Sequence, residues 1–244
     1  DVIESRGLGD VYKRQSEMER MRGHVKNSMK EGAMGIGSSL IYAPGDYAST
    51  EELTELSKVA SEYGGMYISH LRSEGTNLLE ALEELISISR NANIPAEVYH
   101  LKASREPNWS KLDDVIKRIE EVRKEGLKIT ADIYTYNASS TGLTGVIPTW
   151  VQEGGHRAWI NRMKDPDVRP RLLADIREQL DEQPPEGILL VGFKTSKMSR
   201  KYLAKTVAEA AAMRGQTPEE AIVDMVIEDD HRIQCIYFSM SEDN

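Results

Sequence analysis

The strongest constraint on the fold is a regular alternation of short apolar runs with amphipathic segments. The apolar runs are of strand length. They cover residues 33–40, 65–71, 96–101, 128–134, 187–193 and 233–238. In the first half of the chain, one run and the segment after it take about thirty residues, the size of one βα unit. We therefore predict a parallel sheet with helices packed outside it.

The segments between the runs carry the start and stop signals of helices. Ser49 and Glu52 form the pattern of a capping box, and Gly64 is placed to end the same helix. Thr217 followed by Pro218 is a second helix start. Apolar residues at helical spacing fill the stretches in between, including 78–86 and 112–122.

Length and composition narrow the class of protein. The 244 residues suit one eight-stranded barrel or two smaller domains. With 31 Lys and Arg against 40 Asp and Glu, the net charge is −9, the wrong sign for a nucleic-acid-binding face. No apolar run approaches the roughly 18 residues of a membrane span, so we expect no membrane partner. The single cysteine, Cys235, excludes an internal disulfide framework and fits the cytoplasm.

Two stretches break the alternation. Residues 1–15 follow neither strand nor helix spacing, and we interpret them as a tail that is disordered or not native to the protein. Residues 137–186 interrupt the barrel domain expected over residues 16–244. Long loops after barrel strands usually serve the active site, so this insertion is a candidate lid or pocket wall.

His70 and His100 close two consecutive predicted strands. Neighbouring parallel strands lie about 4.8 Å apart, and counting alternate residues puts Ile68 and His70 on the face that corresponds to Val98 and His100. The two imidazoles should therefore be neighbours at the carboxyl edge of the sheet, where they would suit zinc. The alternative is that each histidine is a polar strand end with its own hydrogen-bond partner. Asp132, near the end of the next strand, is expected either to take a hydrogen-bonding role or to be a buried structural partner.

The motifs around these histidines resemble a known family. HLRSEG (70–75), HLKAS (100–104) and ADIYTY (131–136) follow one another on consecutive units. In this order they resemble the D-aminoacylase (N-acyl-D-amino-acid deacylase) family of the metal-dependent amidohydrolase superfamily. The resemblance extends over most of the chain, including residues 31–53, 150–155 and 237–244.

The resemblance implies a fold, a cofactor and a set of site residues. The fold would be α/β, a partial TIM-like (β/α) barrel of the amidohydrolase type with an inserted segment after the fourth recognised strand. The cofactor would be Zn²⁺ and the substrate a small N-acyl amino acid, whereas the oligomeric state stays open. His70 and His100 match two zinc-binding histidines of the family. Five further residues match positions in or near the family's substrate site: Tyr42, Lys102, Tyr134, Arg72 and Ser139.

The chain also departs from the family pattern in two places. The chain contains no HxH metal motif, and the catalytic aspartate of the family would lie beyond Asn244, so neither Glu242 nor Asp243 is assigned as the general base. We interpret the sequence as a fragment that by itself binds zinc weakly and shows no turnover. Two alternatives remain at this point: another amidohydrolase, acting on a cyclic amide or an L-substrate, and a catalytically dead barrel used for binding.

Overall fold

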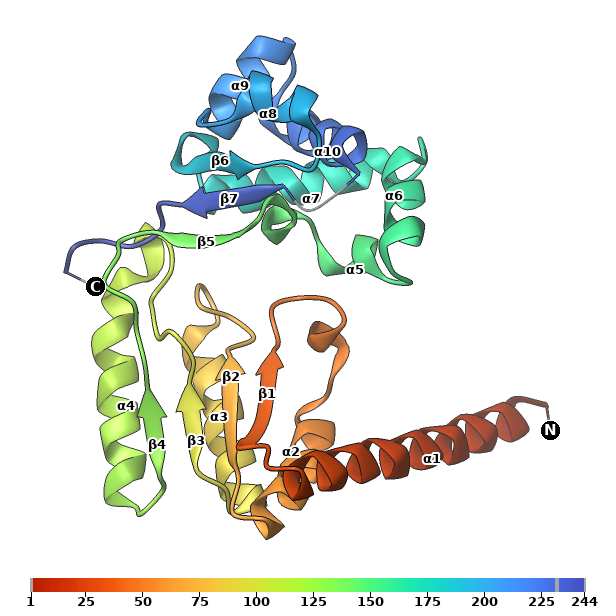
Figure 1. The fold of residues 1–244 in the computed structure, drawn as a ribbon, viewed down its shortest axis with the longest axis vertical. Helices are drawn as coiled ribbons and strands as arrows, with labels where there is room; N and C mark the ends of the chain where they lie inside the picture. The colour runs from red at the N-terminus through yellow and green to blue at the C-terminus, as the bar shows by residue number, and fades with distance from the viewer. Residues whose placement is uncertain (1, 231–232, 244) are drawn as a thin grey trace. The chain divides into compact units, whose positions relative to one another are not determined.

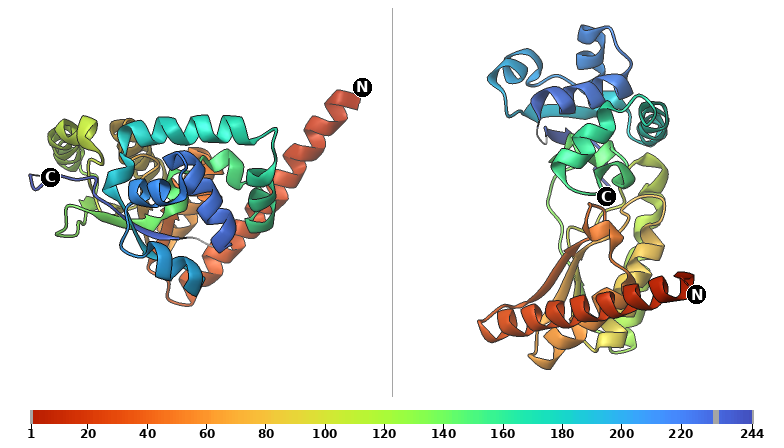
Figure 2. Two further views of the ribbon diagram at one scale, coloured as in Figure 1. Left: turned by 90° about the horizontal axis from the view of Figure 1, so that it is seen from above. Right: turned by 90° about the vertical axis from the view of Figure 1, so that its right-hand side faces the viewer.

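The computed structural model describes residues 2–230 and 233–243 and divides the chain into two compact units (Figures 1 and 2). The first unit comprises residues 1–41, 45–101 and 113–133, and the second comprises residues 42–44, 102–112 and 134–244. The residues expected to form one barrel domain, 16–244, are thus shared between two units.

The first unit contains a four-stranded parallel sheet in the order β1-β2-β3-β4 (Figure 1). Its strands are Gly35–Ser39, Met66–His70, Ala96–Val98 and Ile129–Ala131. These are the first four apolar runs, and their parallel pairing confirms the predicted series of βα units. Helices α1–α4 belong to the same unit, with the bounds Val2–Lys30, Thr50–Glu62, Leu78–Ala92 and Leu112–Lys124.

The helices form where the sequence patterns predict them. The Ser49 hydroxyl accepts a hydrogen bond from the backbone N–H of Glu52 at the start of α2, and Gly64 adopts a positive φ just beyond its end. Along α3, Leu78, Leu82 and their neighbours at helical spacing are fully buried. Burial of one face per helix stabilises the unit by about 1.5–3 kcal/mol for each large apolar side chain.

Helix α1 is longer than the sequence indicates. It runs from Val2 to Lys30 and so includes residues 2–15, which the sequence pattern assigns to a tail. Arg22 joins it to α2 through an ion pair with Glu55. That residues 1–15 are foreign to the protein stays a prediction. Among the described residues, no helix has both the length and the apolar character that a membrane crossing requires.

The second unit is built on a three-stranded antiparallel sheet in the order β5-β7-β6. Its strands are Ser139–Gly142, Gln234–Tyr237 and Ile188–Gly192 in that spatial order. Helices α5–α10 have the bounds Thr149–Gln152, His156–Lys164, Arg169–Glu182, Ser196–Tyr202, Val207–Arg214 and Pro218–Asp229. Four 3₁₀ segments complete the described chain: Gly45–Tyr47, Glu106–Lys111, Leu143–Val146 and Pro185–Gly187.

The prediction that residues 187–193 and 233–238 continue the parallel series is wrong. β6 and β7 pair antiparallel, and β7 lies in the middle of its sheet rather than at an open edge. An apolar run of strand length carries no information about strand direction. Three helices, α8 to α10, connect β6 to β7 and let the chain return in the opposite sense. The predicted insertion, 137–186, belongs to this second unit, which continues beyond residue 186.

An apolar core holds the second unit together. It combines the inner residues of β6 and β7 with those of helices α6, α7, α9 and α10. Cys235 is fully buried within this core, and its burial raises the pKa of the thiol to about 12. The cysteine is therefore a core residue, as its apolar surroundings in the sequence indicate.

Candidate metal centre

His70 is the last residue of β2, and the neighbouring strand fixes its backbone. His70 pairs with Ser39 in the β1–β2 register, and its carbonyl accepts a hydrogen bond of 3.1 Å from the N–H of Leu40. Its side chain is only 7% exposed. The imidazole is therefore held in a dry, ordered position at the carboxyl end of the strand.

The backbone of His100 is held by a turn and not by a strand. β3 ends at Val98, and His100 adopts a left-handed backbone conformation with φ of +44°, a region in which histidine is found more often than most residues. The Asp132 carboxylate accepts a hydrogen bond from the backbone N–H of His100, and the Asp132 carbonyl accepts one of 2.8 Å from Leu101. Asp132 is itself exposed, so the structure gives it the hydrogen-bonding role and not that of a buried partner.

The β2–β3 register differs from the one that the sequence predicts for the two histidines. Tyr67 lies opposite Ala96 and Ser69 opposite Val98, so the face of Val98 is shared with Ser69 and not with His70. Alternation continued along an ideal strand would have placed His100 on the other face. The turn beyond Val98 brings the imidazole back.

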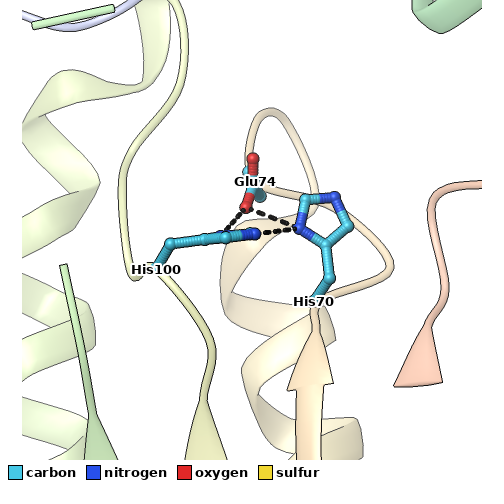
Figure 3. Close-up of side chains that lie close together, drawn as sticks. All are labelled: His70, Glu74 and His100. Carbon is cyan, nitrogen blue, oxygen red and sulfur yellow. Dashed lines mark hydrogen bonds and ion pairs between the residues drawn. The ribbon is translucent and has the colours of Figure 1, made fainter. Parts of the chain in front are cut away.

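The two imidazoles are in contact, as the sequence predicts. His70 Nδ1 lies 2.9 Å from His100 Nε2, and the rings meet edge to face with centroids 4.5 Å apart (Figure 3). Glu74 adds a carboxylate. Its Oε1 is 3.2 Å from His70 Nδ1 and 3.0 Å from His100 Nδ1 (Figure 3). The side chains of Glu74 and His100 are 12% and 19% exposed.

Glu74 is not among the site residues that the sequence predicts. It stands four residues after His70, inside the HLRSEG motif, but it lies in the loop between β2 and α3, where neither period predicts the direction of a side chain. An acidic residue close after a strand-end histidine is the signal that could have found it.

The three side chains together can hold a metal ion. Each offers one ligand atom, and these atoms lie within 4.8 Å of one another. All three come from the first unit. Two imidazoles and one carboxylate form a donor set that suits zinc and related transition metals, whereas magnesium and calcium prefer oxygen ligands throughout.

Arg72 lies next to this cluster in the sequence but binds the protein itself. Its guanidinium forms a bidentate pair with Glu84, with both N–O distances 2.9 Å. It also donates to the carbonyls of Asp46, at 2.8 Å, and Ala48, at 2.9 Å. Hydrogen bonding to Glu84 raises the pKa of Arg72 above its ordinary value. The residue thereby ties the segment after β1 to α3.

The other predicted substrate residues belong to the second unit. Lys102 is buried, with its Nζ 5.5 Å from the centre of the Tyr134 ring. The hydroxyl of Tyr42 lies 2.9 Å from that of Thr141, and Ser139 pairs with Tyr237 across the β5–β7 ladder. These residues are brought together in one compact unit, whereas their contact with a substrate stays a prediction.

Comparison with known proteins gives several similar sequences, although no family model matches the chain. It is 34% identical to a D-aminoacylase of Alcaligenes xylosoxydans xylosoxydans over 127 residues, which are 52% of this chain and 26% of that protein. It is 33% identical to an N-acyl-D-glutamate deacylase of the same organism over 129 residues, which are 53% of this chain and 26% of that protein. The chain thus spans about a quarter of the length of these curated relatives.

Solved structures show the same fold over nearly the whole chain. The N-acyl-D-glutamate deacylase of Bordetella bronchiseptica, solved with zinc and a phosphonate inhibitor, superposes with a TM-score of 0.71 at 24% identity, covering 93% of this chain and 39% of that one. A D-aminoacylase described as defining a novel subset of amidohydrolases superposes with a TM-score of 0.68 at 25% identity, covering 94% and 39%. The α/β fold, the order of the motifs and these relatives agree: the chain is similar to D-aminoacylases of the amidohydrolase type and shares a part of their fold.

Proposed function

We propose that this chain carries part of the metal site of a zinc-dependent amidohydrolase that releases free amino acids from N-acyl-D-amino acids. The observation that carries the proposal is the contact between His70 and His100 at the carboxyl ends of adjacent parallel strands, with ring nitrogens 2.9 Å apart. Carboxyl strand ends are where α/β barrels keep their active sites. The relatives supply the substrate class, because the three curated ones are named for deacylation or D-aminoacylase activity.

The donor set fits zinc. Imidazole nitrogens bind Zn²⁺ at about 2.0–2.1 Å and carboxylate oxygens at about 2.0–2.2 Å, and catalytic zinc sites combine three protein ligands with an open position. His70 and His100 would be two of the ligands. The D-glutamate deacylase that superposes on the chain is described with zinc and a phosphonate inhibitor that mimics the tetrahedral intermediate of its reaction.

A zinc ion held by His70 and His100 would supply Lewis acidity, which polarises a scissile carbonyl and makes water more acidic. The residues of the chain contribute rigidity. His70 is buried and fixed by the β1 ladder, and His100 is fixed by Asp132.

Substrate binding is assigned to the residues of the second unit. Lys102 supplies a cation that complements the carboxylate of an N-acyl amino acid, and Tyr134, Tyr42 and Ser139 supply hydroxyl groups. Arg72 is assigned a positioning role instead, because its guanidinium already makes four hydrogen bonds inside the protein. The net charge of −9 and the single cysteine support a cytoplasmic enzyme that acts on small molecules and not on nucleic acid.

The test is amino-acid release from N-acetyl-D-methionine and from its L-enantiomer by the natural gene product that contains this sequence. We expect activity on the D-form to disappear with a chelator and to return with zinc. His70→Ala and His100→Ala should each lower kcat/KM by at least about 100-fold, since losing a ligand removes more than the 10- to 100-fold that outer partners contribute.

His24→Ala is the matched control, because His24 lies exposed on α1. Its activity should stay within twofold, roughly, of the wild type, as for other surface changes. Unchanged activity in the variant lacking both His70 and His100 would overturn the proposed metal site. Equal turnover of both enantiomers would overturn the substrate assignment.

A further inference from the structure

The two nitrogens of His100 have different neighbours. Nε2 faces His70 Nδ1 at 2.9 Å, and Nδ1 is 3.0 Å from the Oε1 of Glu74 (Figure 3). A neutral imidazole carries a proton on one nitrogen and a lone pair on the other, so its neighbours decide which nitrogen can bind a metal.

Glu74 is placed to make that decision. An ionised carboxylate only accepts hydrogen bonds, and 3.0 Å is within hydrogen-bonding distance. Facing Nδ1, it favours the tautomer with the proton there. The lone pair of His100 is then on Nε2, where it accepts a hydrogen bond of 2.9 Å from Nδ1–H of His70 in the metal-free chain.

We infer that Glu74 is a positioning residue that sets the tautomer of His100, so that Nε2 of His100 is the nitrogen offered to the metal. This inference rests on the proposed function for its purpose, but its geometric content holds for the metal-free chain. Carboxylates that accept from the second nitrogen of a metal-binding histidine fix the ring and increase its basicity.

The contact with His100 supports this role for Glu74. The carboxylate oxygen contacts His100 at Nδ1, the nitrogen turned away from His70. The same Oε1 also lies 3.2 Å from His70 Nδ1, so direct ligation by Glu74 is the alternative that the second measurement tests. The side chain is also only 12% exposed, so it is held in this position and does not sample the solvent freely.

The first measurement needs no metal. Nitrogen-15 NMR of the histidine rings in the 244-residue chain, recorded over a series of pH values, reports which nitrogen of each ring carries the proton. We expect the Nδ1–H form of His100 in the wild type. Glu74→Gln keeps the shape of the side chain but can donate as well as accept, and Glu74→Ala removes the partner. Both should move His100 towards a mixture of tautomers.

The second measurement is metal binding by the same variants. Glu74→Gln should lower zinc affinity by about 10- to 100-fold, as for other outer-shell partners. The absorption spectrum of the chain saturated with Co²⁺ should stay unchanged, because the ligand set is the same. Glu80→Gln is the matched control: it removes the same charge from an exposed site on α3 and should alter neither result.

The outcomes separate the inference from the proposed function. A wild-type His100 protonated on Nε2, or a tautomer that does not respond to either Glu74 variant, overturns the inference. A Co²⁺ spectrum that changes in Glu74→Gln also overturns it, in favour of direct ligation. If His100 has the expected tautomer but the natural gene product takes up no zinc, the proposed function is overturned. The role of Glu74 at His100 is then unaffected.

Discussion

The Arg72–Glu84 pair offers a quantitative test of how the segment after β1 is held. Glu84, on α3, accepts two hydrogen bonds from Arg72 and a third of 2.8 Å from Thr50 at the start of α2. Its side chain is 11% exposed and that of Arg72 is 31% exposed. The perturbations are Arg72→Met, Glu84→Gln and the double variant.

The expected magnitude lies between those of surface and buried ion pairs. Exposed pairs contribute about 0–1 kcal/mol, whereas removing one partner of a buried pair costs about 3–5 kcal/mol. With one partner buried and the other partly exposed, Glu84→Gln should lower the free energy of unfolding by about 2 kcal/mol. Arg72→Met should cost about 1 kcal/mol more, because the carbonyls of Asp46 and Ala48 also lose their donor. The coupling energy between the two residues should be about 1–2 kcal/mol.

Hydrogen exchange of the β2 amides, measured against urea concentration, gives the free energy of opening for the first unit alone. Arg90 and Glu125 form a matched control pair in the same unit, with an N–O distance of 2.6 Å but side chains 47% and 49% exposed. Glu125→Gln should cost no more than about 0.5 kcal/mol. A coupling energy between Arg72 and Glu84 below about 0.5 kcal/mol, the cost expected for the control, would refute the assignment of Arg72 as a positioning residue.

Two further predictions concern close packing at Gly35 and the buried thiol of Cys235. Gly35→Ala would place a Cβ 1.9 Å from a backbone carbonyl of β2 and should lower the free energy of unfolding by about 2 kcal/mol or more. Gly37→Ala would bring its Cβ only to a side chain at 3.6 Å and should cost less than about 1 kcal/mol by thermal unfolding. Equal effects of the two variants would contradict the β1–β2 register. Cys235, whose pKa is raised from 9.0 to about 12, should resist thiol reagents at a pH of about 8 until the second unit opens. Because the folded state holds this proton more tightly, the contribution of Cys235 to stability is complete below pH 9.0 and is lost as the pH rises towards about 12, and Cys235→Ala should remove that slope. Rapid labelling of the native chain would contradict the burial of this thiol.

The sequence by itself determined the local elements of the first unit. Periods of two and 3.6 residues depend only on which side of a strand or helix is buried, so β1 to β4 and the helices between them could be predicted from the apolar pattern. It also determined that His70 and His100 lie at or just beyond the carboxyl ends of consecutive strands, and parallel pairing brings such ends to one edge.

Tertiary structure decided the rest of the site. The β2–β3 register is one residue away from the alignment that alternation suggests, and His100 faces His70 because Asp132 holds a left-handed turn beyond Val98. Glu74 reaches both rings from a loop, whose path depends on distant contacts and not on a repeating pattern.

Contacts between distant segments also explain why the sheet of the second unit could not be predicted. The runs that became β6 and β7 are as apolar as those of the first sheet, and apolar character fixes burial without fixing direction. Strand direction and register are set by which segments meet across long stretches of chain, through connections such as α8 to α10. Burial periodicity is therefore encoded residue by residue, whereas the antiparallel sheet and the orientation of the two imidazoles exist only once the chain has folded.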